Sequence, residues 1–159
     1  MSGTGISAEA VKVFLESYAS AFQASDKDAV ADRYAYPVHV VTHNGGVRFL
    51  AIPSREAWLA VVERILQMYG AMGVRRAAMR DLNVIDISPQ VAQARLVWAL
   101  RGDGDKPLYE FEATYTLAQL DGELKIVQVI WENEQPKFQG VMRERGQPLT
   151  EPARIPRTK

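Results

Sequence analysis

The sequence predicts an α+β domain in which helices come first and a long, twisted antiparallel sheet follows. Before residue 74, apolar side chains recur mainly at the spacing of one helix face. From Val74 onward they fall into long extended segments that are separated by turn residues. The length of 159 residues suits one domain with one well-buried core. We therefore expect a single α+β unit.

Two long helices are predicted, and each has its own N-cap. Ser7 can cap a helix over residues 8–24, and Ser54 can cap another that ends near Gly70 and Gly73. The apolar positions are Val11, Phe14, Leu15, Tyr18 and Phe22 in the first, and Trp58, Leu59, Val62, Ile65, Leu66 and Tyr69 in the other. Both sets follow helical spacing, so each helix should present one apolar face.

A shorter helix and a hairpin are expected between these two helices. Asp26 can cap a helix that runs as far as Tyr34. Pro37 restricts the residue before it to extended geometry and so ends this helix. Residues 38–42 and 47–52 then form two predicted strands, because the Asn-Gly-Gly between them supplies the positive φ angles of a tight turn.

Four long strands complete the prediction. They cover residues 74–87, 91–101, 107–120 and 123–134, with Ser-Pro, Gly-Asp-Gly-Asp and Asp-Gly turns between them. Most strands have about five or six residues, so strands of this length must coil or bend, commonly through bulges. A slip in the apolar alternation, from Leu82 and Val84 to Ile85 and Ile87, predicts one such bulge.

Both faces of these strands carry apolar residues. Leu96, Trp98 and Leu100 alternate with Val97 and Ala99, and the last strand has a similar pattern. The helices can cover only one face of a sheet. We therefore expect a homodimer in which the other face of the sheet packs against a second copy of the chain.

Composition excludes several classes of protein. Apolar residues make up 47% of the chain and charged residues 24%, as in ordinary globular domains. There is no cysteine, which excludes disulfides, thiolate zinc sites and a cysteine nucleophile and fits a reducing compartment. Residues 1–10 lack the pattern of a secretory signal, and no apolar run is long enough for a membrane span. A cytoplasmic protein with no membrane contact is expected.

The end of the chain differs from its body in charge. Residues 135–159 carry six Lys or Arg and two Asp or Glu, although the whole chain has a net charge of zero. These cations are diluted with Pro and Gly, so a solvated or subunit-wrapping arm is favoured over a nucleic-acid contact. The expected organisation is one domain over 1–137 and a basic tail over 138–159.

Two local stretches support a family resemblance. They are the first-helix sequence Tyr-Ala-Ser-Ala-Phe-Gln-Ala-Ser-Asp at 18–26 and the closing Leu-Asp-Gly-Glu-Leu-Lys-Ile-Val-Gln-Val-Ile-Trp-Glu at 120–132. With the order of elements, they resemble the nuclear-transport-factor-2-like (cystatin-like, SnoaL-like) superfamily over residues 8–134. The resemblance implies a conical domain, with three N-terminal helices packed on a strongly curved mixed or antiparallel sheet around an apolar pocket. It also implies frequent dimerisation, but no single activity, because the scaffold serves isomerases, dehydratases, epoxide hydrolases, cyclases and binding modules.

The resemblance places Tyr18 where ketosteroid isomerases hold the tyrosine that hydrogen-bonds the substrate oxygen. The positions of their two acids are occupied here by Thr42 and Thr116. A threonine hydroxyl cannot act as the base at neutral pH, so isomerisation of the steroid type is disfavoured. Tyr18 could equally be a core aromatic residue with a satisfied hydroxyl.

His39 and His43 are the only histidines and therefore the candidate bases near neutral pH. Four residues apart on a strand, their Cα atoms would stand about 13 Å apart, too far to share a metal. His39 is the candidate base, and Asp32 could orient it or a water molecule. The alternatives are that His39 is a structural histidine and that Asp32 is a solvated helix acid. Glu110 and Glu112 form a further acidic pair, but two acids at this spacing are common by chance.

Large side chains on the predicted strands and helices could form the pocket walls. They are Tyr34, Trp58, Trp98, Tyr115, Gln128 and Trp131. The alternative is that they are plain core or interface residues. No phosphate loop or nucleotide fingerprint is present, because Gly102-Asp103-Gly104-Asp105 has the composition of a turn. No cofactor and no metal are expected.

Two functions fit these observations. The first is a pocket that binds a small, mostly apolar organic molecule, with a lyase, cyclase or isomerase step carried by Tyr18 and His39 with help from Asp32. The alternative is a non-catalytic dimeric module that binds a ligand or a protein. A buried, hydrogen-bonded acid–base pair in the pocket would favour the first function, whereas a pocket lined only by apolar groups, or a collapsed one, would favour the second.

Overall fold

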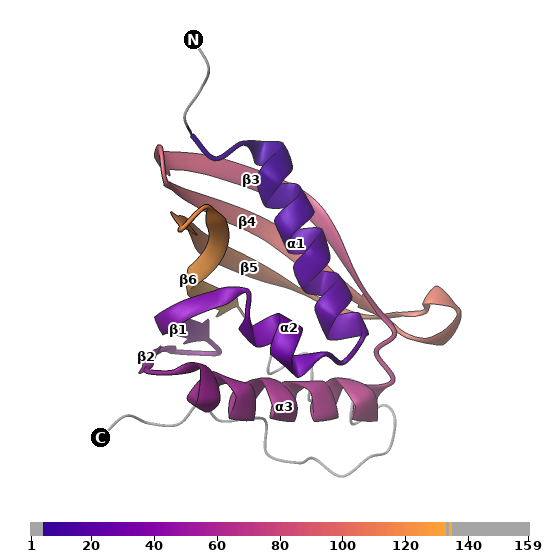
Figure 1. Ribbon diagram of the computed structural model, residues 1–159. Helices are drawn as coiled ribbons and strands as arrows, with labels where there is room; N and C mark the ends of the chain where they lie inside the picture. Colours follow the sequence, from indigo (N-terminus) through magenta and orange to yellow (C-terminus); the bar gives the residue numbers. More distant parts are fainter. Residues whose placement is uncertain (1–4, 133, 135–159) are drawn as a thin grey trace.

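The computed structural model describes residues 5–132 and 134, and Figure 1 shows the arrangement of their elements. These are α1 (Ala8–Gln23), α2 (Lys27–Ala31), β1 (Tyr34–His43), β2 (Val47–Ile52), α3 (Arg55–Met72), β3 (Arg76–Ser88), β4 (Val91–Arg101), β5 (Pro107–Leu120) and β6 (Glu123–Glu132), with a 3-10 turn at Asp103–Asp105. The predicted α+β class and order of elements are confirmed. The predicted basic tail, 138–159, lies outside the described residues.

One mixed sheet organises the domain. Its strand order is β2-β1-β6-β5-β4-β3. Neighbouring strands are antiparallel except for β1 and β6, which are parallel. In Figure 1, α1 crosses the long strands β3, β4 and β5, while α3 runs beside α2 and β2. The helices therefore cover one face of the sheet.

The caps of the two long helices are formed as predicted. The Ser7 hydroxyl accepts a hydrogen bond from the backbone N–H of Ala10 at 3.0 Å, and Ser54 accepts one from Ala57 at 3.2 Å. On α1, the buried side chains include Leu15 and Tyr18, and the apolar face points to the sheet. The predicted stripe is thus the surface that the sheet covers.

The second helix is shorter than predicted. It ends at Ala31, and Tyr34 belongs to β1 instead of to the helix. The backbone oxygen of Arg33 accepts a hydrogen bond from the N–H of Ile126 in β6 at 2.8 Å, and the side chain of Tyr34 is only 3% exposed. Pairing with a distant strand and burial of an aromatic ring therefore outweigh the local helical pattern.

The first strand consequently begins earlier than predicted, at Tyr34 instead of residue 38. Pro37 lies inside β1, in the stretch where the register with β6 shifts between Tyr34 and His39. A proline cannot donate to a ladder, so an irregular stretch is the place where a strand accommodates one. The hairpin itself is confirmed, with His43 opposite Val47.

The four-strand meander is also confirmed, and β3 has register shifts at both ends of the predicted slip. In β3 the register shifts between Arg80 and Asn83, where Asp81 has a φ of 56°, and again between Asp86 and Ser88. Val84 and Ile85, at the middle of the predicted slip, are regularly paired, and the shifts include Leu82 and Ile87 at its two ends. The extra residues of a bulge change which face the following side chains occupy, and this appears in the sequence as a slip in alternation.

The outer face of the sheet is more polar than its sequence pattern indicates. At its centre, Arg95 bonds Glu112 at 2.6 Å, and Arg80 pairs with Glu110. Apolar side chains are exposed toward the two edges of the sheet. They are Val47 (69%) and Phe49 (72%) on β2, and Ile85 (45%) and Ile87 (55%) on β3. The outer face thus combines ion pairs with exposed apolar residues. The homodimer through this face remains a prediction.

None of the helices in residues 5–132 combines the length and the hydropathy that a membrane span requires.

Two glycines at the end of α3 give a paired prediction. Gly73 caps the helix with φ 75° and ψ 30°, whereas Gly70 is helical and a Cβ added there would contact nothing. We expect Gly73→Ala to lower the free energy of unfolding by about 1 kcal/mol, because alanine is strained in the left-handed region. Gly70→Ala should raise it by up to about 1 kcal/mol. Urea titration of both variants checks the opposite signs, and equal effects would contradict this account.

Candidate functional site

A cavity of about 160 Å³ lies between the helices and the inner face of the sheet. A cavity of about 150 Å³ is enough to hold a benzene ring, so this space suits a small organic molecule. Seven aromatic side chains line it among the residues that the structure describes: Tyr18, Phe22, Tyr69, Trp98, Phe111, Tyr115 and Trp131. The walls are therefore largely aromatic, as in most sites for small organic ligands.

Helix and strand periodicity bring these rings to one place. Tyr18 and Phe22 are four residues apart on α1, so they share one face of that helix. Phe111 and Tyr115 are four residues apart on β5 and point to the same face of the sheet. The ring of Tyr18 lies 5.1 Å from that of Phe22 and 5.8 Å from that of Tyr115, both edge to face. Tyr18 is thus central to the aromatic wall.

Two hydrogen bonds join polar atoms of this aromatic cluster. The hydroxyls of Tyr18 and Tyr34 bond each other, and the indole N–H of Trp98 donates to the Tyr115 hydroxyl at 2.8 Å. Burial raises the pKa of Tyr18 and that of Tyr34 well above the ordinary value of 10. These hydroxyls therefore stay neutral at physiological pH and can act only as hydrogen-bonding groups.

Glu134 brings a carboxyl group to the same cavity. The hydroxyl of Tyr69 donates to its Oε1 atom at 2.6 Å, and the hydroxyl of Tyr109 donates to the same atom at 3.0 Å. The residue keeps some solvent exposure, but burial of the carboxyl raises its pKa above 4.5. The two tyrosine hydrogen bonds act in the opposite direction, because they stabilise the charged form.

Glu134 is the functional candidate that sequence analysis missed. The last strand was predicted to continue to residue 134, and alternation from the inward-facing Trp131 would turn residue 134 outward. The strand ends at Glu132 instead, so alternation no longer applies beyond it. The two tyrosines that donate hydrogen bonds to Glu134, Tyr69 and Tyr109, come from α3 and β5. They are far from Glu134 in the sequence, so no local motif indicates this contact.

Most predicted wall residues lie at or behind the cavity. Trp98, Tyr115 and Trp131 line it, as does Tyr18, which was predicted as a catalytic residue. Tyr34 and Trp58 form a second layer: their ring centroids are 5.0 Å apart, and Trp58 stacks on Trp131 at 6.0 Å. The indole N–H of Trp58 is buried and has no hydrogen-bond partner among the described residues.

Gln128 and His39 lie on the opposite side of the sheet. They face each other in the register of β6 and β1, and Gln128 accepts a hydrogen bond from Thr116 at 3.0 Å. His39 is exposed, whereas its neighbours Val38 and Val40 are buried toward the helices. The structure therefore does not bring His39 together with Tyr18.

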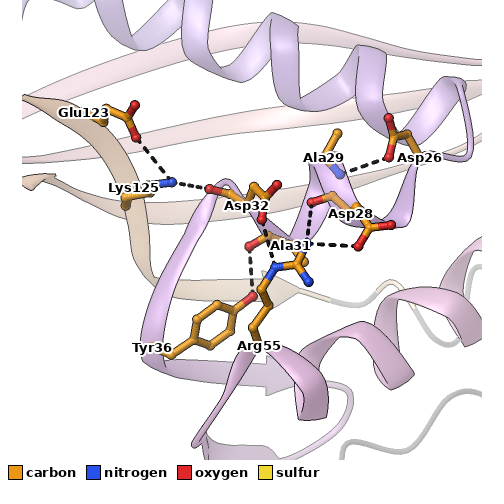
Figure 2. A network of polar contacts seen from close by, with 9 residues as sticks. All are labelled: Asp26, Asp28, Ala29, Ala31, Asp32, Tyr36, Arg55, Glu123 and Lys125. Carbon is orange, nitrogen blue, oxygen red and sulfur yellow. Dashed lines mark hydrogen bonds and ion pairs between the residues drawn. The ribbon is translucent and has the colours of Figure 1, made fainter.

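Asp32 belongs to a surface network (Figure 2). Its carboxylate accepts a hydrogen bond from Arg55 Nε at 2.8 Å, while Arg55 Nη2 bonds Asp28 at 2.9 Å. Lys125 from β6 donates to the backbone oxygen of Asp32 and pairs with Glu123. These exposed pairs tie α2 to α3 and β6, and each contributes little on its own. Asp32 is not among the residues that line the cavity.

In residues 5–132 and 134, no group of three or more His, Cys, Asp or Glu side chains is placed to hold a metal ion. The cavity offers aromatic walls, neutral hydroxyls and one carboxyl. Such a set can bind an organic molecule and can exchange a proton with it.

The raised pKa of Glu134 predicts how stability depends on pH. The group binds protons more readily when folded, so its contribution to stability is full below its unfolded pKa near 4.5 and is lost as pH rises through the folded pKa. In Glu134→Gln this fall should be absent. Tyr109→Phe removes a hydrogen bond that lowers the pKa, so the fall should extend to higher pH.

Chemical denaturation between pH 4 and pH 9 measures this dependence. A difference in the free energy of unfolding between the wild type and Glu134→Gln that stays constant over this range would contradict the account.

Comparisons with known proteins agree on the fold. A family model described as NTF2-like protein (DUF6841) matches residues 8–134. No curated protein matches the sequence.

Among solved structures, an NTF2-like protein of unknown function from Pseudomonas putida is 18% identical, with a TM-score of 0.61, and the match covers 80% of this chain and 89% of that one. A protein from Streptomyces avermitilis, provisionally assigned as a dehydratase of the NTF2-like family, is 14% identical with a TM-score of 0.60, covering 78% and 93%. A provisionally assigned scytalone dehydratase from Novosphingobium aromaticivorans is 15% identical with a TM-score of 0.57, covering 77% and 80%. At these identities the likeness establishes the fold alone.

Proposed function

The chain belongs to the NTF2-like protein family DUF6841, and we propose that it binds a small, mostly apolar organic molecule in its cavity. The observation that carries this proposal is the aromatic cavity of about 160 Å³ with the Glu134 carboxyl at its wall. A ligand of that size would replace water against the rings and gain the free energy of apolar burial.

The proposal extends to proton transfer of a lyase, cyclase or isomerase type. A buried, hydrogen-bonded acid is present in the cavity, which supports chemistry over a purely apolar binding site. Burial moves the pKa of Glu134 upward, toward the range in which a carboxyl both takes and gives a proton efficiently near neutral pH. The dehydratase assignments of two structural neighbours agree with this class of reaction.

The roles of the residues follow from their positions. Glu134 exchanges the proton, and Tyr18 borders the ligand with a neutral hydroxyl that is already bonded to Tyr34. His39 and Asp32 are not assigned to the reaction, because one faces the outer side of the sheet and the other is paired with Arg55 at the surface.

A cavity-filling variant tests ligand binding. Ala77 lines the cavity, whereas Ala78 pairs with Ala99 on the other face of the same strand. A ligand at 100 times its Kd should stabilise the wild type by about 2.7 kcal/mol, or several degrees in Tm. We expect Ala77→Phe to abolish the shift and Ala78→Phe to retain it. A thermal-shift screen of small aromatic carbonyl compounds and monoterpenoids provides the ligands, and shifts that persist in Ala77→Phe would place binding elsewhere.

The second candidate is a dimeric binding module, and the exposed apolar residues at the edges of the outer sheet face favour it. We propose that this face packs against a second copy of the chain. Its central ion pairs and exposed apolar edges would then contact the same features of the other copy about a twofold axis.

Light scattering at micromolar concentration should then give the mass of a dimer. Phe49→Asp should shift the mass toward the monomer, and Val13→Asp, an exposed apolar residue on α1, should leave it unchanged. A monomeric wild type removes the proposal.

A further inference from the structure

The aromatic wall of the cavity is electron-rich. Five of its seven rings belong to tyrosine or tryptophan, and an aromatic ring carries negative charge density on its face. Tryptophan and tyrosine are the side chains that attract a cation most strongly over the ring. The wall therefore favours a ligand that carries positive charge as well as apolar surface.

The two oxygens of the Glu134 carboxyl differ in their partners among the described residues. Tyr69 and Tyr109 both donate to Oε1, and no described residue donates to Oε2. A carboxylate oxygen accepts a stronger hydrogen bond from a charged donor than from a neutral one. Because Glu134 lines the cavity, a ligand there can donate to Oε2.

No protein cation inside the described cavity wall neutralises Glu134. Arg75 is the one basic residue among the described lining residues, and its Nε atom bonds Asp103 at 2.9 Å. Its side chain is 62% exposed, so it sits at the rim and is already paired. Within the part of the chain that the structure describes, the cavity thus has a negative charge that no other lining residue offsets.

We propose that the ligand is an organic cation: a protonated amine on a flat or compact apolar body, with the Glu134 carboxylate as its counter-ion and the tyrosine and tryptophan rings around it. The inference rests on the proposed function, because it concerns the same cavity. An ammonium group can donate to the Glu134 carboxylate and lie against the tyrosine and tryptophan rings at once. A neutral ligand lacks the charge that pairs with the carboxylate, and an anion is repelled.

Three probes of one size test the charge preference. Benzylammonium, benzyl alcohol and benzoate share a phenyl ring and differ in the charge of the substituent. Isothermal titration calorimetry at low salt and neutral pH should show benzylammonium binding about tenfold more tightly than benzyl alcohol. Benzoate should bind more weakly than either.

Two variants that each remove one negative charge locate the counter-ion. Glu134→Gln should bring the affinities for benzylammonium and benzyl alcohol to within about twofold of each other, because the charge within the cavity is lost. Glu132→Gln removes a carboxylate from the outer face of the sheet, where Glu132 pairs in register with Glu112. It should keep the wild-type preference.

The outcomes separate this inference from the proposed function. Equal affinities for benzylammonium and benzyl alcohol in the wild type overturn the cation inference and leave small-molecule binding in place. A preference that survives in Glu134→Gln also overturns it. If none of the three probes binds at millimolar concentration, both proposals fail. The wild-type comparison decides the matter even if Glu134→Gln does not fold.

Discussion

The parallel pairing of β1 with β6 is the contact on which the rest of the domain depends. It inserts the last strand between the N-terminal hairpin and the meander, and so joins two parts that sequence neighbours alone would leave separate. Its first link is the hydrogen bond from Ile126 N–H to the oxygen of Arg33. The pairing brings Trp131 against Trp58 of α3, and it delivers Glu134 to the space between α3 and β5. The chemistry of the cavity thus depends on a contact between the two ends of the domain.

Small residues contribute to the space of the cavity. Ala19 on α1, Gly70 on α3 and Ala77 on β3 line it together with rings from β4, β5 and β6. Interiors are normally packed to the density of organic crystals, so larger residues at these three positions would fill the space. The aromatic rings form edge-to-face contacts with one another and hold the wall in place around it. Rigid walls around a preformed space reduce the ordering that a ligand must impose.

Local pattern was sufficient to predict most of the elements. The caps at Ser7 and Ser54 and the left-handed end at Gly73 are properties of a few adjacent residues, and the helices begin and end accordingly. Long-range pairing was not predictable in this way. Tyr34 joins a strand because Ile126, far along the chain, is its neighbour, and nothing local to Tyr34 indicates that.

The candidate site was predicted in part, and for the same reason. The aromatic wall follows from alternation within regular strands, so Trp98, Tyr115 and Trp131 were found. His39 was proposed as a base because the chain has only two histidines, but alternation puts it on the face opposite Val38 and Val40. Glu134 was missed because it follows the end of β6, where direction depends on tertiary contacts with Tyr69 and Tyr109.

The stacking of Trp58 on Trp131 and the bond from Trp98 to Tyr115 have an optical consequence. The chain contains three tryptophans, and all three belong to the wall of the cavity or to the layer directly behind it. Its ultraviolet emission therefore originates around one small space, and the tyrosines there lie close enough to pass excitation to the indoles. A molecule that enters would change the polarity and contacts of these fluorophores together, so the protein carries its own spectroscopic reporter of occupancy and needs no attached dye.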